Sequence, residues 1–328
     1  MSKILITGGA GFIGSHLADR LLSQGISVVV LDNLSTGSRD NLAHAVDNPL
    51  LEVVVGDVND RALLASLVDK VDAIYHLAAS VGVKHIMDNL VSSIQNNVDG
   101  TIAVLEAAAV SGKKVLITST SEVYGKLSEG PSAETDDLRM GETIRSRWSY
   151  ACSKALDEYL AFAYFHERNL PVTVVRLFNT VGERQTDAYG MVLPTFVKQA
   201  LSGAPITIHG DGTQSRCFAY VKDVVWALDG LMNSDTATGE VFNIGSTEMV
   251  TINELAQLVV QVTGSSSAVE YIPYEKAYAV GFEDASRREP DISKISSAIG
   301  FEVRHNLRDI ITKVAESLKE AVASKVKV

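Results

Sequence analysis

The sequence predicts an α/β protein with a Rossmann-type, doubly wound parallel sheet and a smaller C-terminal substrate domain. Three observations lead to this prediction. A glycine-rich turn near the N-terminus lies between a strand pattern and a helix pattern, strand and helix patterns then alternate as far as residue 179, and longer loops with recurrent Gly and Pro follow. Such alternation is typical of parallel strands whose connecting helices cover both faces of the sheet.

The glycine-rich turn, Thr-Gly-Gly-Ala-Gly-Phe-Ile-Gly at 7–14, has the spacing of a dinucleotide-binding loop. Gly8 can form the tight turn, Gly11 leaves room for a phosphate, and Gly14 lets the helix pack close to the strand. A second strand pattern ends in Asp32, where a carboxylate would accept hydrogen bonds from an adenosine ribose. A plain glycine turn with a capping aspartate is the alternative, and the strand, helix and strand context favours the dinucleotide site.

The patterns of the first half can be placed segment by segment. The expected strands and helices are 3–7, 12–24, 27–31, 52–56, 61–68, 73–76, 91–110, 114–119, 148–167 and 172–177. The apolar or β-branched runs 53–55 and 172–175 are expected to be strands buried on both faces. Ligands of such sheets bind at the carboxyl ends of the strands. The residues found there are Gly8, Asp32, Asp57, Val58, Leu77, Ala78, Ala79, 118–122, Phe178 and Asn179.

The second half predicts a substrate domain that the chain enters more than once. The apolar segment 240–244 is expected to rejoin the main sheet. The expected cofactor domain is therefore 1–179 plus about 215–247, and the substrate domain is about 180–214 plus 248–328. The last segment, 307–328, has the pattern of an amphipathic helix with a basic tail.

Composition excludes several classes of function. A net charge of −11 argues against binding to nucleic acid, which the molecule as a whole would repel. No run approaches the ~20 apolar residues of a membrane span, and the N-terminus has no cleavable apolar segment. The two cysteines, Cys152 and Cys217, have no metal-ligand spacing. We therefore expect a cytoplasmic protein without a metal site.

Tyr150 and Lys154 are the candidate acid–base pair. Four residues apart at the start of a helix pattern, they share a helix face, which places an ammonium beside a phenol. Lowering a tyrosine pKa from ~10 toward ~7 requires roughly 4 kcal/mol, which the ammonium and a positively charged nicotinamide could supply together. An ordinary surface pair is the alternative, and the upstream dinucleotide loop favours the general base.

Taken together, these motifs resemble the extended short-chain dehydrogenase/reductase family, and within it the nucleotide-sugar epimerases, dehydratases and decarboxylases. The resemblance covers nearly the whole chain. It rests on the glycine turn at 8–14, Asp-Asn-Leu-Ser-Thr-Gly at 32–37, His-Leu-Ala-Ala at 76–79, Thr-Ser-Glu-Val-Tyr-Gly at 120–125, and Tyr150 with Lys154. It implies a bound NAD that oxidises a sugar at C4 and usually reduces the product again.

The resemblance also implies roles for individual residues. Asp32 favours NAD over NADP, and Arg39 is the one nearby cation that weakens this preference. The implied catalytic residues are Thr120, Glu122, Tyr150 and Lys154. The implied NAD-binding residues are Gly8, Gly11, Phe12, Ile13, Gly14, Asp32, Asn33, Ser35, Thr36, Gly37, Asp57, Val58, Leu77, Ala78, Ala79, Asn97, Thr118, Tyr150 and Lys154. The implied substrate-binding residues are Lys84, Thr120, Ser121, Glu122, Asn179, Arg184, Arg216 and Arg288.

The choice of reaction depends on the segment Thr120-Ser121-Glu122. Dehydratases of the family usually carry an aspartate where this chain has Ser121, and simple epimerases commonly carry a small or neutral residue where it has Glu122. The pattern is similar to that of UDP-glucuronate decarboxylases, in which C4 oxidation creates a β-keto acid. A carboxylate at position 122 is expected to repel the substrate carboxylate until CO₂ leaves.

Other functions stay open. A UDP-sugar 4-epimerase could use Arg184 to hold a substrate carboxylate, and the start of the Tyr150 helix together with a lengthened loop at 275–286 departs from many decarboxylases. A reductase that releases its cofactor and an NAD-binding sensor or scaffold without chemistry are further alternatives. The family also implies a homodimer formed by the two long helices near 91–110 and 148–167.

Overall fold

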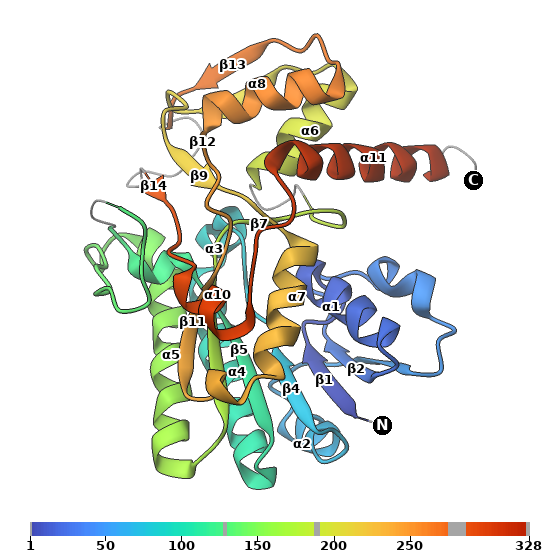
Figure 1. The fold of residues 1–328 in the computed structure, drawn as a ribbon, viewed down its shortest axis with the longest axis vertical. Coiled ribbons are helices and arrows are strands. Elements are labelled where there is room, and N and C mark those ends of the chain that lie inside the picture. The colour runs from blue at the N-terminus through green and yellow to red at the C-terminus, as the bar shows by residue number, and fades with distance from the viewer. Residues whose placement is uncertain (1, 127–129, 187–190, 275–286, 326–328) are drawn as a thin grey trace.

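The computed structural model describes residues 2–126, 130–186, 191–274 and 287–325, without the side chains of 83–85 and 321–325. Its centre is a parallel sheet of seven strands in the order β11-β6-β5-β4-β1-β2-β3 (Figure 1). The strands are β1 (Lys3–Thr7), β2 (Ser27–Asp32), β3 (Leu51–Val55), β4 (Ala73–His76), β5 (Lys114–Thr120), β6 (Val172–Leu177) and β11 (Glu240–Ile244). The predicted doubly wound parallel sheet is confirmed.

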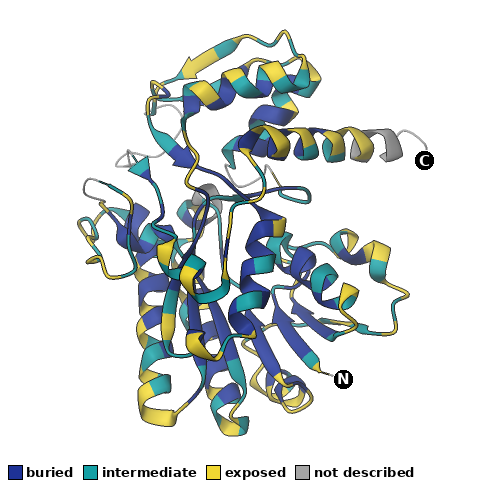
Figure 2. Cartoon of the chain, in the orientation of Figure 1, coloured by how far each residue is buried: buried dark blue, intermediate teal, exposed yellow. Residues whose placement is uncertain are grey.

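Helices cover both faces of this sheet. Helices α1 (Phe12–Ser23) and α7 (Val221–Met232) pack on one face, and α2 (Arg61–Val68), α4 (Leu90–Ser111) and α5 (Ser149–Arg168) pack on the other. Side chains of a strand alternate between the two faces, so Ile4 and Ile6 belong to one core and Leu5 to the other. Figure 2 shows the sheet as the most deeply buried layer of the molecule. Short turns of helix, η1 (Arg39–Ala45), η2 (Ser121–Tyr124), η3 (Ser146–Trp148), η4 (Asp235–Ala237) and α3 (Val83–Asp88), lie between these elements.

The predicted segments of the first half all form, with ends shifted by at most one residue. One expectation about their burial is wrong. β6 is buried as expected, but β3 is the edge strand and pairs only with β2 among the described strands. Val53 and Val55 of β3 are 38% and 46% exposed. An apolar run does not reveal whether a strand has neighbours on both sides, and only a central strand is covered from every direction.

Much of the second half, apart from α7 and β11, forms a smaller layer beyond the carboxyl ends of the sheet (Figure 1). The predicted return of 240–244 to the main sheet is confirmed, because β11 pairs in parallel with β6. Helix α10 (Ser293–Ile299) packs on α7 and β11, so part of the C-terminal sequence also contacts the sheet layers. The domain boundaries stay a prediction. The remaining elements are β7 (Thr180–Val181), α6 (Val192–Ser202), β8 (Ile206–His209), β9 (Ser215–Cys217), β10 (Ala219–Tyr220), β12 (Met249–Thr251), α8 (Ile252–Thr263), β13 (Val269–Ile272), β14 (Arg287–Arg288), α10 (Ser293–Ile299) and α11 (Leu307–Lys325).

Helix α8 shows how the sequence sets local structure in this layer. Thr251 and Glu254 form a reciprocal capping box at its start, and Gly264 at φ +65° ends it. Its apolar side packs with α6 and α11, which confirms the amphipathic helix expected at the C-terminus. The expected basic tail at 326–328 and the expected loop at 275–286 lie outside the described residues.

The glycine-rich turn connects β1 to α1 under steric constraint. Gly8 has φ +72°, and a Cβ on it would lie 2.7 Å from the backbone nitrogen of Ala78. A Cβ on Gly14 would collide with the carbonyl oxygen of Gly8, so α1 packs against the turn more closely than any other residue would allow. The turn therefore needs glycine for both backbone conformation and space.

We expect Gly8→Ala to destabilise the protein more than Gly25→Ala. Gly25 has a similar φ of +75° but open space around its Cβ position, so it isolates the cost of the left-handed backbone, about 1–2 kcal/mol. Gly8→Ala adds a backbone collision to that cost. Urea unfolding of the two variants measures the difference, and equal free energies of unfolding would contradict the steric argument.

Candidate active site

A cleft of about 1110 Å³ is lined by residues at the carboxyl ends of the sheet strands and by residues of the C-terminal layer. Pockets for one small ligand are commonly ~300–1,000 Å³, so this cleft has room for a second ligand. The structure brings most of the predicted residues to it. Those lining the cleft are Gly8, Gly11, Phe12, Ile13, Gly14, Asp32, Asn33, Ser35, Thr36, Asp57, Val58, Leu77, Ala78, Ala79, Thr118, Thr120, Ser121, Glu122, Tyr150, Lys154, Asn179, Arg184, Arg216 and Arg288.

One end of the cleft fits the pyrophosphate and ribose of NAD. The N-terminus of α1 opens onto it, and Gly11 and Gly14 keep side chains away from the free N–H groups. Asp32 accepts hydrogen bonds from the backbone nitrogens of Ala10 (2.9 Å) and Leu34 (2.8 Å). Each of its two oxygens therefore has one further acceptor position, which suits two ribose hydroxyls.

The adenine side of this end is also ordered by hydrogen bonds. The amide of Asn33 donates to Asp57 at 2.9 Å, and the backbone nitrogen of Asn59 donates to the other carboxyl oxygen. These bonds, that from Asn59 first, lower the pKa of Asp57, so its carboxylate remains an acceptor. Arg39, the cation that weakened the preference for NAD, is exposed.

Three predicted binding residues are not seen to line the cleft. Gly37 lies behind Asp32, and a Cβ on it would come within 3.1 Å of that carboxylate and within 2.9 Å of the backbone carbon of Ala10. Asn97 is buried and accepts a hydrogen bond from the backbone nitrogen of Ser80 (2.7 Å). The side chain of Lys84 lies outside the described residues. Gly37 and Asn97 therefore support the cleft wall.

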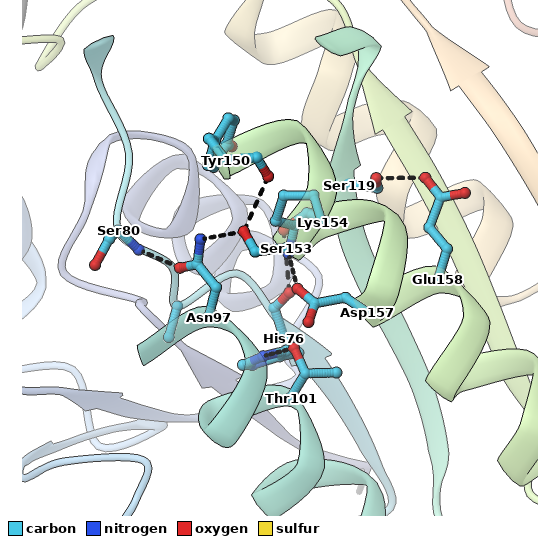
Figure 3. A network of polar contacts seen from close by, with 12 residues as sticks. His76, Ser80, Asn97, Thr101, Ser119, Tyr150, Ser153, Lys154, Asp157 and Glu158 are labelled. Carbon is cyan, nitrogen blue, oxygen red and sulfur yellow. Dashed lines mark hydrogen bonds and ion pairs between the residues drawn. The ribbon is translucent and has the colours of Figure 1, made fainter. Parts of the chain in front are cut away.

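The amide of Asn97 connects this wall to the helix that carries the acid–base pair. Its nitrogen donates to Ser153 (3.2 Å), and the Ser153 hydroxyl donates to the backbone oxygen of Tyr150 (2.9 Å) (Figure 3). Lys154 is buried, and its ammonium donates to the carboxylate of Asp157 at 2.7 Å. The start of α5 is thus fixed by polar contacts on both sides of the Tyr150–Lys154 face.

The surroundings of Tyr150 differ from the expectation. Burial raises the pKa of Tyr150, and the carboxylates of Glu122 and Asp157 raise it further. A hydrogen bond with Thr120 and the charge of Arg147 act in the opposite direction but do not reverse it. The predicted lowering is therefore not produced by the protein's side chains alone, and the positive charge of the nicotinamide, which the prediction also invoked, has to supply it.

Glu122 lies between two arginines. Its Oε2 forms an ion pair with Arg147, and its Oε1 lies 3.2 Å from Nη1 of Arg288. All three side chains are largely buried and line the cleft. Burial acts to raise the pKa of Glu122, but Arg288 and then Arg147 outweigh it and hold the value at about 2. Glu122 is therefore a fixed carboxylate.

The repulsion expected of Glu122 stays a prediction, and the two arginines oppose it. Two guanidinium groups and one carboxylate carry a formal charge of +1, which favours an anionic ligand over a neutral one. Arg147 was missed by the sequence analysis. It lies in η3, just before the helix that the sequence predicts from 148, so the helix pattern gave no signal for it.

The other predicted substrate residues lie elsewhere along the cleft. The guanidinium of Arg184 donates to Asp19 on α1 at 2.8 Å, which places it beside the helix that follows the glycine-rich turn. Asn179 donates to the backbone oxygen of Cys217 (3.1 Å), and Arg216 to that of Ser215 (2.8 Å). Asn179 and Arg216 therefore lie on adjoining segments, where they could contact the diphosphate or base of a nucleotide.

Neither a metal site nor a membrane-spanning helix is present among the described residues. No described group of three or more His, Cys, Asp or Glu side chains is placed to hold a metal ion. Among the described helices, none combines the length and apolar character needed to cross a bilayer.

Proteins of similar sequence belong to a family that uses NAD, in agreement with the geometry of the cleft. Residues 4–245 match the model of the NAD dependent epimerase/dehydratase family. UDP-N-acetyl-alpha-D-glucosaminuronate decarboxylase of Bacillus cytotoxicus is 42% identical over 301 residues, which are 91% of this chain and 92% of that protein. UDP-glucuronic acid decarboxylase 1 of Arabidopsis thaliana is 37% identical over 320 residues, 98% of this chain and 70% of the plant protein.

Solved structures show the same architecture. UDP-glucuronic acid 4-epimerase from Bacillus cereus, in complex with UDP-glucuronic acid and NAD, has a TM-score of 0.88 and 28% identity, with 97% of this chain and 99% of that chain covered. UDP-glucose 4-epimerase from Thermotoga maritima, with UDP-glucose, has a TM-score of 0.88 and 29% identity, with 98% and 99% covered. The predicted NAD cofactor and the family resemblance are confirmed: the chain belongs to the NAD-dependent epimerase/dehydratase family, a branch of the extended short-chain dehydrogenases/reductases.

Proposed function

We propose that this enzyme is a UDP-glucuronate decarboxylase that acts through transient oxidation at C4. The observation that carries the proposal is the ion-paired cluster of Arg147, Glu122 and Arg288 in the cleft. Two of its members, Glu122 and Arg147, also act on the pKa of Tyr150. A formal charge of +1 suits a sugar that carries a carboxylate. The decarboxylase names of the sequence relatives support the same reading.

The first chemical step is oxidation of the C4 hydroxyl. Gly8, Gly11, Gly14 and Asp32 would hold NAD, which would supply hydride acceptance from C4 and hydride return. Tyr150 takes the hydroxyl proton as general base, and Thr120, which hydrogen-bonds to Tyr150, shares that proton. Arg216 and Asn179 would hold the nucleotide diphosphate, so that the sugar reaches the far end of the cleft.

The second step is loss of CO₂ from the resulting 4-keto acid. The C5–C6 bond breaks, its electron pair forms the C4–C5 enolate, and neutral CO₂ leaves. The developing oxyanion at C4 lies where Tyr150 and Thr120 donate hydrogen bonds, which stabilises it. C5 then takes a proton from a water molecule, and the C4 ketone re-forms. Arg147 and Arg288 bind the substrate carboxylate. The negative charge of Glu122 weakens this binding, so the charged substrate is not stabilised more than the transition state in which CO₂ leaves.

A 4-epimerase is the second candidate. The structural relative from Bacillus cereus is named an epimerase, and its complex contains UDP-glucuronic acid. An epimerase would leave the carboxylate in place and reduce the ketone from its other face. A reductase would consume reduced cofactor in proportion to product, and a sensor or scaffold would show no turnover at all.

Product analysis separates these possibilities. Purified protein is incubated with UDP-glucuronate, UDP-N-acetylglucosaminuronate, UDP-glucose and UDP-xylose, and products are identified by NMR and mass spectrometry. Loss of CO₂ from a uronate, giving a UDP-pentose or its 4-keto form in the case of UDP-glucuronate, supports the proposal. An isomer of unchanged mass from any of them establishes an epimerase.

We expect Tyr150→Phe to reduce turnover by about 10²-fold or more, because the general base is lost, and to leave bound NAD in place. Steady-state rates and the nucleotide content of the purified protein measure the two effects. Tyr159→Phe, on the exposed side of the same helix, is the matched control and should retain full activity. Full activity in Tyr150→Phe would remove the proposed base.

We expect Glu122→Gln to slow CO₂ release about 10- to 100-fold more than C4 oxidation. Without the carboxylate, both arginines hold the substrate carboxylate, and the charged ground state gains more than the departing neutral CO₂. Rapid mixing with UDP-glucuronate measures reduced nicotinamide and CO₂ separately. Glu142→Gln, an exposed partner of Arg145, is the control. Equal effects on both steps would contradict the proposed role.

We also propose that the enzyme is a homodimer in the cytoplasm. Helices α4 and α5 pack side by side and expose Val91 (71%), Tyr159 (68%) and Leu156 (44%), which supports a shared apolar interface. Light scattering should give twice the mass of the chain, and Tyr159→Glu should shift it toward the monomer. A monomeric wild-type protein would overturn the dimer. The compartment stays a prediction that cell fractionation tests.

A further inference from the structure

Asp157 is a charged residue that the proposed chemistry does not use. It lies on α5 one turn after Lys154, is fully buried, and does not line the cleft. Its Oδ2 nevertheless lies 2.7 Å from the ammonium of Lys154, which does line the cleft. Burial of a carboxylate is costly, and pairing with a cation offsets only part of that cost. Removal of the Asp157 carboxylate would leave the buried Lys154 ammonium without its bonded anion, so the effect of Asp157 on Lys154 is the feature to explain.

The surrounding groups single out Asp157 as the anion that faces Lys154. Glu158, the next carboxylate on α5, is bound by Arg176 of β6 and by Ser119 of β5. His76 of β4 is buried, and burial and Lys154 lower its pKa to about 3, so it is neutral near pH 7. It hydrogen-bonds to Thr101 of α4, whose hydroxyl also acts on Asp157 (Figure 3).

We propose that Asp157 is a positioning residue for the acid–base pair: it holds the Lys154 ammonium in place and offsets its charge, and so tunes the proton exchange of Tyr150. The inference rests on the proposed function only for the identity of the hydroxyl that Tyr150 serves. The contact geometry supports the claim that Asp157 holds the Lys154 ammonium in place, because the two side chains are bonded within one turn of α5.

The charge of Asp157 has an effect of definite direction on the pKa of Tyr150. The carboxylates that raise the pKa of Tyr150 are Glu122 of η2 and Asp157, and the opposing groups are Thr120 at the end of β5 and Arg147 of η3. Removal of the Asp157 charge takes away one of the negative charges that disfavour the phenolate. It also leaves the Lys154 ammonium without its bonded anion, and a cation near a phenol favours the phenolate. Both changes lower the pH at which Tyr150 loses its proton.

The test is a direct titration of Tyr150 in the NAD-containing protein. Tyrosine is labelled with ¹³C at Cζ, and the signal that disappears in Tyr150→Phe is assigned to this residue. We expect Asp157→Asn to shift its titration midpoint downward by about one pH unit. Asp157→Glu, which keeps the charge, should titrate near the wild type. Glu167→Gln removes one charge from an exposed position on the same helix and should have no effect.

Enzymatic data give a second readout. The acidic limb of the pH dependence of C4 oxidation should move downward in Asp157→Asn by the same amount as the titration. An unchanged titration with lower thermal stability would show a structural role only and overturn the proposal. If Asp157→Asn does not fold, Asp157→Ser takes its place. Absence of UDP-glucuronate turnover would refute the proposed function, yet the titration of Tyr150 would still test Asp157.

Discussion

The ion pairs of Glu122 join the two layers of the molecule at the cleft. Glu122 follows β5 of the central sheet, and Arg288 belongs to β14, which pairs with β9 in the C-terminal layer. The 3.2 Å contact between them spans 166 positions of sequence, and Arg147 closes the cluster from the segment before α5. The part of the cleft beside Tyr150 is therefore complete only when the two layers are packed together. Residues from three separate segments set its charge.

Helix α5 brings a second set of charges to the same region. Tyr150, Lys154 and Asp157 follow one another at helical spacing, so a single rigid element fixes the base, its neighbouring cation and the counterion. Buried charges at this density are expensive, and each is offset by a named partner. The arrangement keeps Tyr150 protonated without the cofactor, which ties its activation to the arrival of the nicotinamide charge.

Local sequence rules anticipated much of this structure. Some site features depend only on residues that are close together in the chain: the glycine turn, Asp32 and the pairing of Tyr150 with Lys154. Their spacing was therefore enough to predict that they lie at the cleft. The exposed edge strand β3 was missed because an apolar run carries no information about neighbouring strands. The clamping of Glu122 by Arg288 and the support given by Asn97 depend on contacts between distant segments, which periodicity does not encode.

The central claim is that Arg147, Glu122 and Arg288 together form a site for a sugar carboxylate. Calorimetry with NAD-containing Tyr150→Phe protein, in which turnover is blocked, compares the affinities of UDP-glucuronate and UDP-glucose. Charge-assisted hydrogen bonds to the carboxylate predict that UDP-glucuronate binds about 10- to 100-fold more tightly. Equal affinities, or tighter binding of UDP-glucose, would contradict the account.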